Sequence, residues 1–269
     1  MSLLEKERLN LYQEAAKLFW TRLKWDLRGP VAWENRQKLR SLKDCRKGEK
    51  AVILCNGPSL IKTDFKLLKE SNVFTIGMNK IYLLKDSVDF DPDLVVCFDH
   101  RMISECHEEF AKFTQPLFLS RAGVHEFGKK PNVHYLDLSS LICFPRDISL
   151  SVYHGATTTY GALLIAYYFG FSEVALVGCD HNWNHTKVEK ESGSTRAVMG
   201  DKDESHFHPD YFTKGTQFIM PNVVESEFSY RMARSAFEEN GRRLVNATEG
   251  GQLDIFERMS LNAFLDPSS

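Results

Sequence analysis

The sequence predicts an α/β fold: a Rossmann-like, mostly parallel sheet with helices on both faces, preceded by an N-terminal helical extension. Two observations support this fold class. From Lys50 onward, short apolar runs alternate with helix-like segments, as in parallel sheets that are covered on both sides. In the clearest unit, a helix-like segment from Thr157 to Gly170 precedes the apolar run 174–178. Threonine is a common N-cap and glycine a common helix end, so this helix carries both boundary signals.

The first 48 residues are predicted as a helical extension, separate from a nucleotide-binding catalytic domain over 49–269. A large apolar residue recurs every seven positions within 3–28, at Leu4, Leu11, Leu18 and Trp25. Gly29-Pro30 ends this helix, and 31–48 is predicted as a second, strongly charged helix. For the first helix, docking on its own domain or pairing in a homo-oligomer is favoured. Peripheral membrane contact through residues 1–48 is the alternative.

The elements of the domain are predicted from their apolar patterns. Strands are expected at 51–55, 73–77, 94–98, 116–120, 133–136, 173–178 and 242–246. Helices are expected at 64–70, 102–112, 158–170 and 225–240, with a last helix in the tail 246–265. The segment 182–222 is polar, weakly periodic and rich in His, Asp, Lys and Gly. So long an irregular stretch in a compact domain is typically functional, and we predict a lid-like insertion there.

The composition excludes some functional classes. The net charge of -2 argues against a dedicated nucleic-acid binder. Residues 1–50 carry 13 Lys/Arg against 7 Asp/Glu, an excess that suits phosphates, a membrane surface or an ordinary solvated helix. The six cysteines include no Cys-x-x-Cys pair, which is typical of reduced thiols. No apolar run is long enough to span a bilayer, so we expect a cytoplasmic protein, free or at the inner face of the membrane.

Polar clusters follow four of the predicted strands. They are Asn56-Gly57-Pro58-Ser59, Gly77-Met78-Asn79, Asp99-His100 and Gly178-Cys179-Asp180-His181. Ligands of open parallel sheets bind outside the carboxyl ends of the strands, so we expect these clusters to converge on one cleft. In the first cluster, Gly57 lets a ligand approach the backbone, and Asn56 and Ser59 lie where a helix start would seat a phosphate. The alternative is an ordinary strand-to-helix turn.

The remaining candidates each have a structural alternative. Asn79 can contact a base or ribose edge, or form its own turn. Asp99 and Asp180 can orient sugar hydroxyls, hold a divalent cation or act as a base, and either can simply cap a helix. Thr157 and Thr158 can hold a second phosphate, and an N-cap role is equally expected for them.

His206 and His208 are the sharpest candidates for acid–base chemistry. Histidine titrates near neutral pH, and a mobile segment can carry it over a cleft. The pattern does not choose between the two residues, and a solvent-exposed role without chemistry is the alternative for either. Zinc binding through His181, His185, His206 and His208 is disfavoured because no cysteine pairs with them at ligand spacing. No metal site is therefore predicted.

Taken together, several segments resemble the MptE-like (DUF115) proteins, which include 6-hydroxymethylpterin diphosphokinases and proteins of surface-glycan biosynthesis. The segments are Cys55–Leu60, the strand end at Asn79, Thr157–Gly170, Val174–Asp180 and Asn246–Gly251. The same order of motifs is similar to the Cst-type bacterial sialyltransferases. The resemblance covers about residues 50–260 and is more specific for the superfamily than for one reaction.

The resemblance implies roles for individual residues. Asn56, Gly57 and Ser59 would hold the nucleotide phosphate, and Asn79 and Asp99 would contact the nucleotide or the donor sugar. Asp180 matches the strand-end aspartate, and His206 or His208 would be the catalytic base. The chain departs from the sialyltransferase pattern at three positions. Asp99 stands in place of Asn, the 157–159 segment lacks the glycine of Thr-Ser-Gly, and Gly155 stands where an arginine is expected.

The resemblance also implies two reactions. In the first, a glycosyltransferase moves a sugar, of sialic-acid-like type, from a CMP-linked nucleotide sugar to a surface-glycan acceptor without a cofactor. In the second, a diphosphokinase transfers diphosphate from ATP to 6-hydroxymethylpterin and uses Mg²⁺ held by Asp99 and Asp180. The basic N-terminal extension and the histidine-rich segment favour the first. A nucleotide-binding protein without catalysis is a third alternative.

Overall fold

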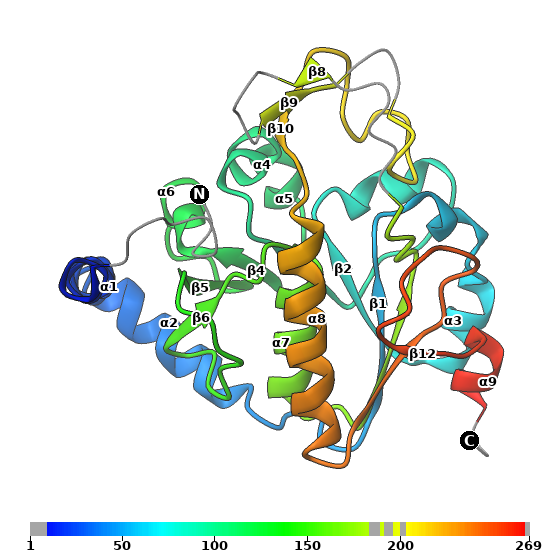
Figure 1. Ribbon diagram of the computed structural model, residues 1–269, viewed down its shortest axis with the longest axis horizontal. Helices are drawn as coiled ribbons and strands as arrows, with labels where there is room; N and C mark the ends of the chain where they lie inside the picture. The colour runs from blue at the N-terminus through cyan, green and yellow to red at the C-terminus, as the bar shows by residue number, and fades with distance from the viewer. Residues whose placement is uncertain (1–9, 183–188, 191–195, 200–202, 267–269) are drawn as a thin grey trace.

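The computed structural model describes residues 10–182, 189–190, 196–199 and 203–266. Within these residues, nine strands form one parallel sheet in the order β12-β11-β7-β1-β2-β3-β4-β5-β6 (Figure 1). The strands are β1 (Lys50–Leu54), β2 (Phe74–Met78), β3 (Leu94–Cys97), β4 (Leu117–Ser120), β5 (Val133–Ser139), β6 (Ser151–Tyr153), β7 (Glu173–Val177), β11 (Arg243–Asn246) and β12 (Glu257–Arg258). The predicted α/β fold class is confirmed.

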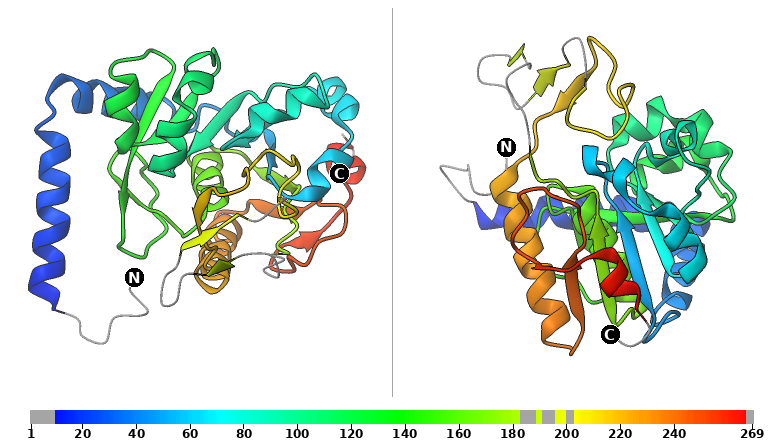
Figure 2. Two further views of the ribbon diagram at one scale, coloured as in Figure 1. Left: turned by 90° about the horizontal axis from the view of Figure 1, so that it is seen from above. Right: turned by 90° about the vertical axis from the view of Figure 1, so that its right-hand side faces the viewer.

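Helices cover both faces of this sheet. They are α1 (Leu11–Asp26), α2 (Pro30–Ser41), α3 (Phe65–Ser71), α4 (His100–Glu105), α5 (His107–Ala111), α6 (Val124–Phe127), α7 (Thr158–Phe169), α8 (Val223–Glu238) and α9 (Leu261–Leu265). Short 3₁₀ turns connect them, among them η2 (Pro58–Lys62) and η3 (Ile81–Asp86). Figures 1 and 2 show α7 and α8 on one face of the sheet and α3 on the other.

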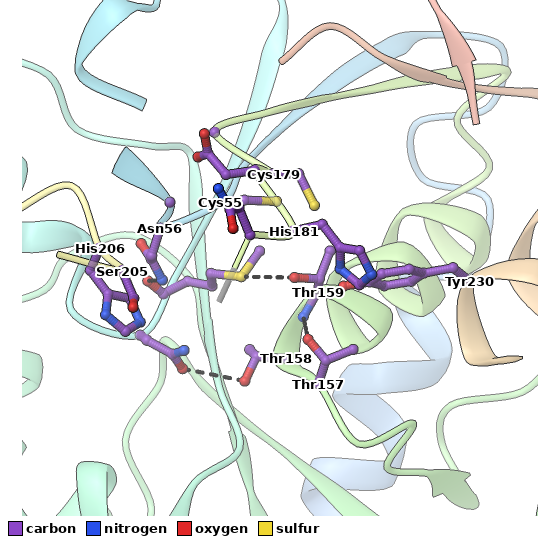
Figure 3. A pocket seen from close by; sticks show the side chains of 16 residues that line it. Cys55, Asn56, Thr157, Thr158, Thr159, Cys179, His181, Ser205, His206 and Tyr230 are labelled. Atoms are coloured by element: carbon purple, nitrogen blue, oxygen red, sulfur yellow. Dashed lines mark hydrogen bonds between the residues drawn. The ribbon is translucent and has the colours of Figure 1, made fainter. Parts of the chain in front are cut away.

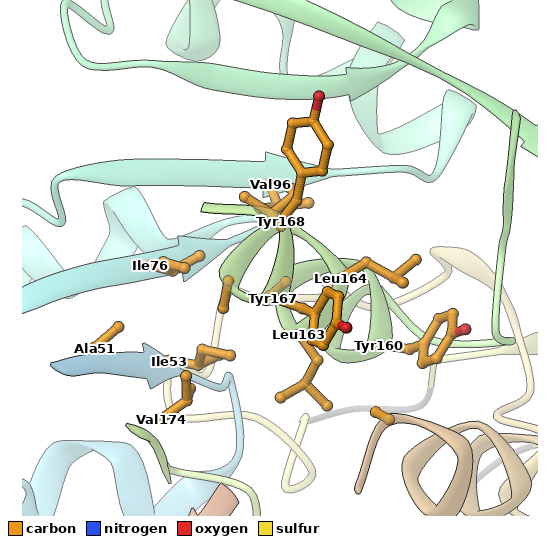
Figure 4. Close-up of a cluster of buried hydrophobic side chains, with 14 of the residues drawn as sticks. Ala51, Ile53, Ile76, Val96, Tyr160, Leu163, Leu164, Tyr167, Tyr168 and Val174 are labelled. Atoms are coloured by element: carbon orange, nitrogen blue, oxygen red, sulfur yellow. The ribbon is translucent and has the colours of Figure 1, made fainter. Parts of the chain in front are cut away.

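The sequence of β1 explains why both faces are covered. Side chains alternate along a strand, and here Ala51 and Ile53 join the core under α7, whereas Val52 and Leu54 join the core on the opposite face. All four side chains are fully buried. Figure 4 shows the core that contains Ala51 and Ile53, in which α7 lies across the strands. The continuous apolar run of β1 therefore reflects burial on two sides, as expected for a central parallel strand.

Helix α7 is the central helix of the fold. Eleven of its twelve residues are buried, so it is apolar on nearly all sides and sits between the sheet and α8. Its boundaries match the predicted signals. The Thr157 hydroxyl accepts a hydrogen bond from the Thr159 amide, and Gly170 ends the helix with φ of 92°. That left-handed conformation suits glycine, which has no Cβ to clash.

Several predicted boundaries were wrong. The helix expected at 102–112 begins earlier, at His100, because the Asp99 side chain caps it, and it breaks at Cys106 into α4 and α5. The charged helix expected at 31–48 ends at Ser41. Beyond it, the amides at 44, 46 and 48 bond to the carbonyls at 168–170, at the C-terminal end of α7, so they are not available for a helix ladder.

Three features lay outside the predicted pattern. Strands β6 and β12 are too short to give an apolar run, and both residues of β12 are exposed. The described part of the 182–222 insertion contains a small antiparallel sheet of β8 (Glu189–Lys190), β9 (Arg196–Val198) and β10 (Gln217–Ile219). Figure 1 shows this small sheet above the carboxyl ends of the main strands.

The two N-terminal helices lie at the β5 end of the sheet. Asn35 of α2 both donates to the Tyr135 carbonyl (2.8 Å) and accepts from the Tyr135 amide (2.7 Å), which blocks the exposed edge of β5. The first helix begins at Leu11 after the N-cap Asn10, and residues 3–9 of the predicted helix lie outside the described part of the chain. Among the described residues, no helix is long and apolar enough to cross a membrane.

Candidate functional site

The strand order places a pocket at the switch point of the sheet. The chain leaves β1 toward β2 on one side, whereas β7 pairs with β1 on the other side. Open parallel sheets bind ligands outside the carboxyl ends of two such strands. The pocket lies there, lined by residues at the ends of β1, β2 and β7, by the start of α7, by Ser205 and His206 of the insertion and by Tyr230 of α8. Figure 3 shows His206 and Asn56 on one side of it and Thr157 and His181 on the other.

The structure brings together eight of the twelve site residues expected from the sequence. Those that line the pocket are Asn56, Gly57, Asn79, Thr157, Thr158, Asp180, His181 and His206. Those outside its lining are Pro58, Ser59, Asp99 and His208. Three of the four strand-end clusters thus converge, and the cluster at Asp99 does not. The Asp99 carboxylate instead accepts from the Arg101 amide (2.9 Å) as the N-cap of α4.

The turn after β1 is closed by the strand-end carboxylate of β7. Asp180 Oδ2 accepts hydrogen bonds from the Ser59 amide (3.1 Å) and the Ser59 hydroxyl (2.9 Å). Gly57 donates its amide to the Gly178 carbonyl (2.9 Å), and a Cβ at Gly57 would lie 2.1 Å from Asp180 Oδ2. Asp180 therefore occupies the two Ser59 donors and the Gly178 carbonyl occupies the Gly57 amide, so these groups are not free for a phosphate. Glycine is needed at position 57 because Asp180 approaches so closely.

The Asn56 side chain forms hydrogen bonds through its nitrogen but, among the described residues, none through its oxygen. Its Nδ2 donates to the Met78 carbonyl (3.1 Å) and to the Tyr211 hydroxyl (3.1 Å). Its Oδ1 is buried and accepts no hydrogen bond among the described residues. Leaving a buried acceptor unpaired costs about 1–3 kcal/mol, so a ligand that donated a hydrogen bond here would recover that cost.

Backbone strain gathers around the pocket. Five described residues other than glycine have positive φ; two of them, Asn79 (51°) and His181 (52°), line the pocket, and Ala156 (57°) immediately precedes Thr157. Such conformations cost free energy and are concentrated at binding and catalytic sites. Asn79 is fixed by a bond from its amide to the Val96 carbonyl (2.8 Å), and His181 by contact of Nε2 with Glu227 (3.1 Å).

His206 is positioned by a buried carboxylate. Its Nδ1 lies 2.8 Å from Asp203 Oδ2, and the Asp203 side chain is fully buried. The imidazole ring stacks on Tyr211 at a centroid distance of 3.9 Å and an interplanar angle of 2°. In the tautomer whose Nδ1–H donates to Asp203, the imidazole carries its lone pair on Nε2, which is the tautomer that a general base requires.

The two candidate bases, His206 and His208, have different environments. His208 lies outside the pocket lining, where Nε2 contacts Asp86 Oδ2 (3.2 Å) and Nδ1 accepts from the Asp210 amide (3.2 Å). The contacts of His208 therefore fasten the insertion to η3, whereas those of His206 orient its ring beside the pocket. The described residues contain no group of three or more His, Cys, Asp or Glu side chains placed to hold a metal ion, and His185, one of the four histidines considered for zinc, lies outside them.

Tyr211 supports the pocket residues without lining the pocket, and the sequence analysis missed it. It is 1% exposed, and besides contacting Asn56 and His206 it offers its carbonyl to Lys80 Nζ (2.8 Å). The Phe207 amide also bonds to the Asn56 carbonyl (3.0 Å), so residues 203–212 are docked directly on the ends of β1 and β2. The available signal was the group of aromatic residues within an otherwise polar segment.

The pocket is close to neutral in charge. The pKa of Cys55 is raised mainly by its contact with the Cys179 thiol and, second, by burial. Burial also raises the pKa of Tyr230. These groups therefore stay protonated at neutral pH. Among the described residues that line the pocket there is no Lys or Arg, and Asp180 is the single carboxylate. Neutral hydroxyls, amides and imidazoles supply the rest of its polar surface.

Comparisons with known proteins give two similarities. The family model described as "6-hydroxymethylpterin diphosphokinase MptE-like" matches residues 32–186, more than half of the chain. A solved structure, the MAf glycosyltransferase from Magnetospirillum magneticum AMB-1, is similar with a TM-score of 0.49 and 18% sequence identity. That similarity covers 86% of this chain and 39% of the glycosyltransferase, so this chain spans well under half of that enzyme. No curated protein matches the chain.

Proposed function

This chain belongs to the MptE-like family, and from the geometry of its pocket we propose that it is a transferase that moves a sugar from a nucleotide sugar to a hydroxyl of a glycan acceptor. The observation that carries the proposal is the Asp203–His206 pair beside the switch-point pocket. A neutral imidazole oriented by a buried carboxylate is suited to accept a proton from an attacking hydroxyl.

In the proposed reaction, the acceptor oxygen forms a bond to the anomeric carbon of the donor sugar while its proton passes to His206 Nε2. The bond between the anomeric carbon and the nucleotide phosphate oxygen breaks, and the phosphate leaves with the bonding electrons. Asp203 stabilises the imidazolium that forms. Thr158 and the first amides of α7 lie at the pocket and are suited to stabilise the departing phosphate.

The charge of the pocket favours a donor with little phosphate charge. A triphosphate is usually bound with Lys, Arg and a metal ion, and the described lining contains no Lys or Arg. A CMP-linked sugar carries a single phosphodiester charge, which hydroxyls and helix-start amides can stabilise. We therefore propose a CMP-linked donor.

The second candidate is the diphosphokinase reaction, which is favoured by the description of the family model. Mg²⁺, when bound, would neutralise the phosphates of ATP in that reaction. Of the two carboxylates expected to hold it, Asp180 lines the pocket and Asp99 does not. Mg²⁺ often binds through one carboxylate together with substrate phosphates, so Asp180 alone fits as its protein ligand.

A donor-consumption assay tests the proposed base. CMP-linked sugars are incubated with the protein, and released CMP is measured with and without a glycan acceptor. We expect His206→Asn to lower kcat by about 10²–10⁴-fold, since general bases contribute on that order. His208→Asn is the matched control and should stay within about threefold of the wild type, because His208 lies outside the pocket.

The outcome that contradicts the assignment is a loss of turnover in His208→Asn with His206→Asn unaffected. Diphosphate transfer from ATP to 6-hydroxymethylpterin, without any consumption of nucleotide sugars, would instead establish the second candidate.

A further inference from the structure

Exposed apolar side chains are concentrated in the N-terminal arm, defined here as residues 10–41. Eleven large hydrophobic side chains are exposed in the described part of the chain, and six of them belong to this arm. They are Leu11 (70% exposed), Tyr12 (89%), Phe19 (60%), Trp20 (58%), Leu27 (74%) and Trp33 (63%). Large apolar groups gathered in one segment indicate an interaction surface, whereas single ones scattered over a protein do not.

The arm is anchored at its base. Trp25, at the last turn of α1, is 4% exposed and packs edge-on against Tyr135. Arg22 contacts the buried carboxylate of Asp137 (3.4 Å), and Arg121 donates to the Thr21 carbonyl (2.8 Å). Figure 2 shows the rest of α1 standing away from the body of the protein. The outer turns of α1 are therefore presented to solvent in a fixed direction.

The outward side of α1 carries apolar, mostly aromatic side chains with lysines beside them. At 100° per residue, Tyr12, Phe19, Trp20 and Leu23 fall on the side opposite to Trp25. Lys17 and Lys24 lie one turn before and one turn after Trp20, so basic groups flank the aromatic side.

The charge of the arm indicates its partner. Residues 10–41 contain seven Lys/Arg and three Asp/Glu. Pairing of two such arms would bring like charges together, whereas a negatively charged lipid surface complements them. Tryptophan and tyrosine are also the side chains preferred at the boundary between lipid headgroups and acyl chains.

We propose that this arm binds the surface of an anionic lipid bilayer, with α1 lying in the plane of the interface. Phe19 and Trp20 insert between the headgroups, and Lys17 and Lys24 extend toward the lipid phosphates. The inference rests on the arm alone and does not depend on the proposed reaction.

Vesicle co-sedimentation of the full chain tests this proposal. The vesicles contain phosphatidylcholine either alone or mixed with phosphatidylglycerol. We expect the protein to sediment with the anionic vesicles and to be released as the salt concentration rises, because salt screens the attraction. Replacing both Phe19→Ser and Trp20→Ser should lower the partition coefficient at least about tenfold, since two apolar side chains no longer insert.

The control is the double replacement Val224→Ser and Phe228→Ser, which removes one aliphatic and one aromatic exposed side chain from α8. It should bind vesicles as the wild type does. Circular dichroism of both variants shows whether each is folded.

Two results would overturn the proposal. One is vesicle binding that is absent in the wild type or equal in the two double variants. The other is a dimer, detected by light scattering in the absence of lipid, that dissociates in the Phe19→Ser/Trp20→Ser variant; a second copy of the chain would then cover this face.

Discussion

Single residues of the pocket show what a sequence pattern conveys and what it omits. His206 and His208 are two positions apart and both flank Phe207, so the pattern treats them alike. Their difference lies in partners: His206 faces the buried Asp203, and His208 faces Asp86 on η3. The spacing of Asp203 and His206 was visible in the sequence, but the burial of Asp203 depends on the tertiary packing of the insertion.

His134 is a residue with a consequence for stability. It is buried against Phe118 with a ring-centroid distance of 4.6 Å, and its Nδ1 has no partner among the described residues. Burial and, to a smaller extent, the charge of Lys38 lower its pKa from 6.5 to about 4. The His134 imidazole therefore binds a proton near pH 6.5 in the unfolded chain, but only near pH 4 in the folded chain. The contribution of His134 to the free energy of unfolding is therefore fully present above pH 6.5 and is lost as the pH drops toward 4.

We predict that His134→Phe, which keeps an aromatic ring beside Phe118, reduces the loss of unfolding free energy at low pH. Between pH 7.5 and pH 5, the free energy of unfolding of the wild type should fall by about 2 kcal/mol more than that of the variant. Urea denaturation at the two pH values measures both differences. An equal loss in the two proteins would show that His134 is not responsible.

At the level of elements, prediction succeeded where the boundary signals are local. The Thr157 cap and Gly170 mark α7 in the sequence, and the apolar run of β1 marks a strand buried on both sides. Strand β12 could not be found in this way, because both of its residues are exposed and it is defined by pairing with β11. The small sheet in the insertion likewise depends on pairing between segments of only two or three residues.

The turn between β1 and η2 has room only for glycine at position 57. A Cβ at Gly57 would lie 2.6 Å from the Gly178 carbonyl as well as against Asp180, and a backbone carbonyl cannot move aside as a flexible side chain can. We expect Gly57→Ala to lower the free energy of unfolding by about 1–3 kcal/mol and to weaken nucleotide binding, because the turn must shift out of the pocket.

The control for this change is Gly241→Ala. Its Cβ would meet no atom within 4 Å, but its φ is 65°, so it should cost about 1 kcal/mol through backbone strain alone. Thermal unfolding with and without nucleotide compares the two variants. Equal nucleotide binding by Gly57→Ala and the wild type would contradict the placement of the ligand at this turn.

At the level of the whole molecule, the strand order creates the site. Alternating strands and helices predict that polar strand ends share one edge of a parallel sheet, and three of the four clusters do meet. The sequence does not specify which strands are neighbours. Pairing of β7 with β1 brings Asp180 to Ser59 across 121 positions, whereas β3 lies farther along the sheet and leaves Asp99 outside the pocket.

The measurement that tests the central claim most directly is a thermal-shift panel of CMP, CDP, UDP, GDP and ATP, each with and without Mg²⁺. A ligand that binds only the folded chain raises the melting temperature according to its occupancy. A pocket that binds a CMP-linked donor through neutral groups predicts stabilisation by CMP without metal, with a smaller effect in Gly57→Ala. Stabilisation by ATP alone, and only with Mg²⁺, would contradict the sugar-transfer proposal and support diphosphate transfer.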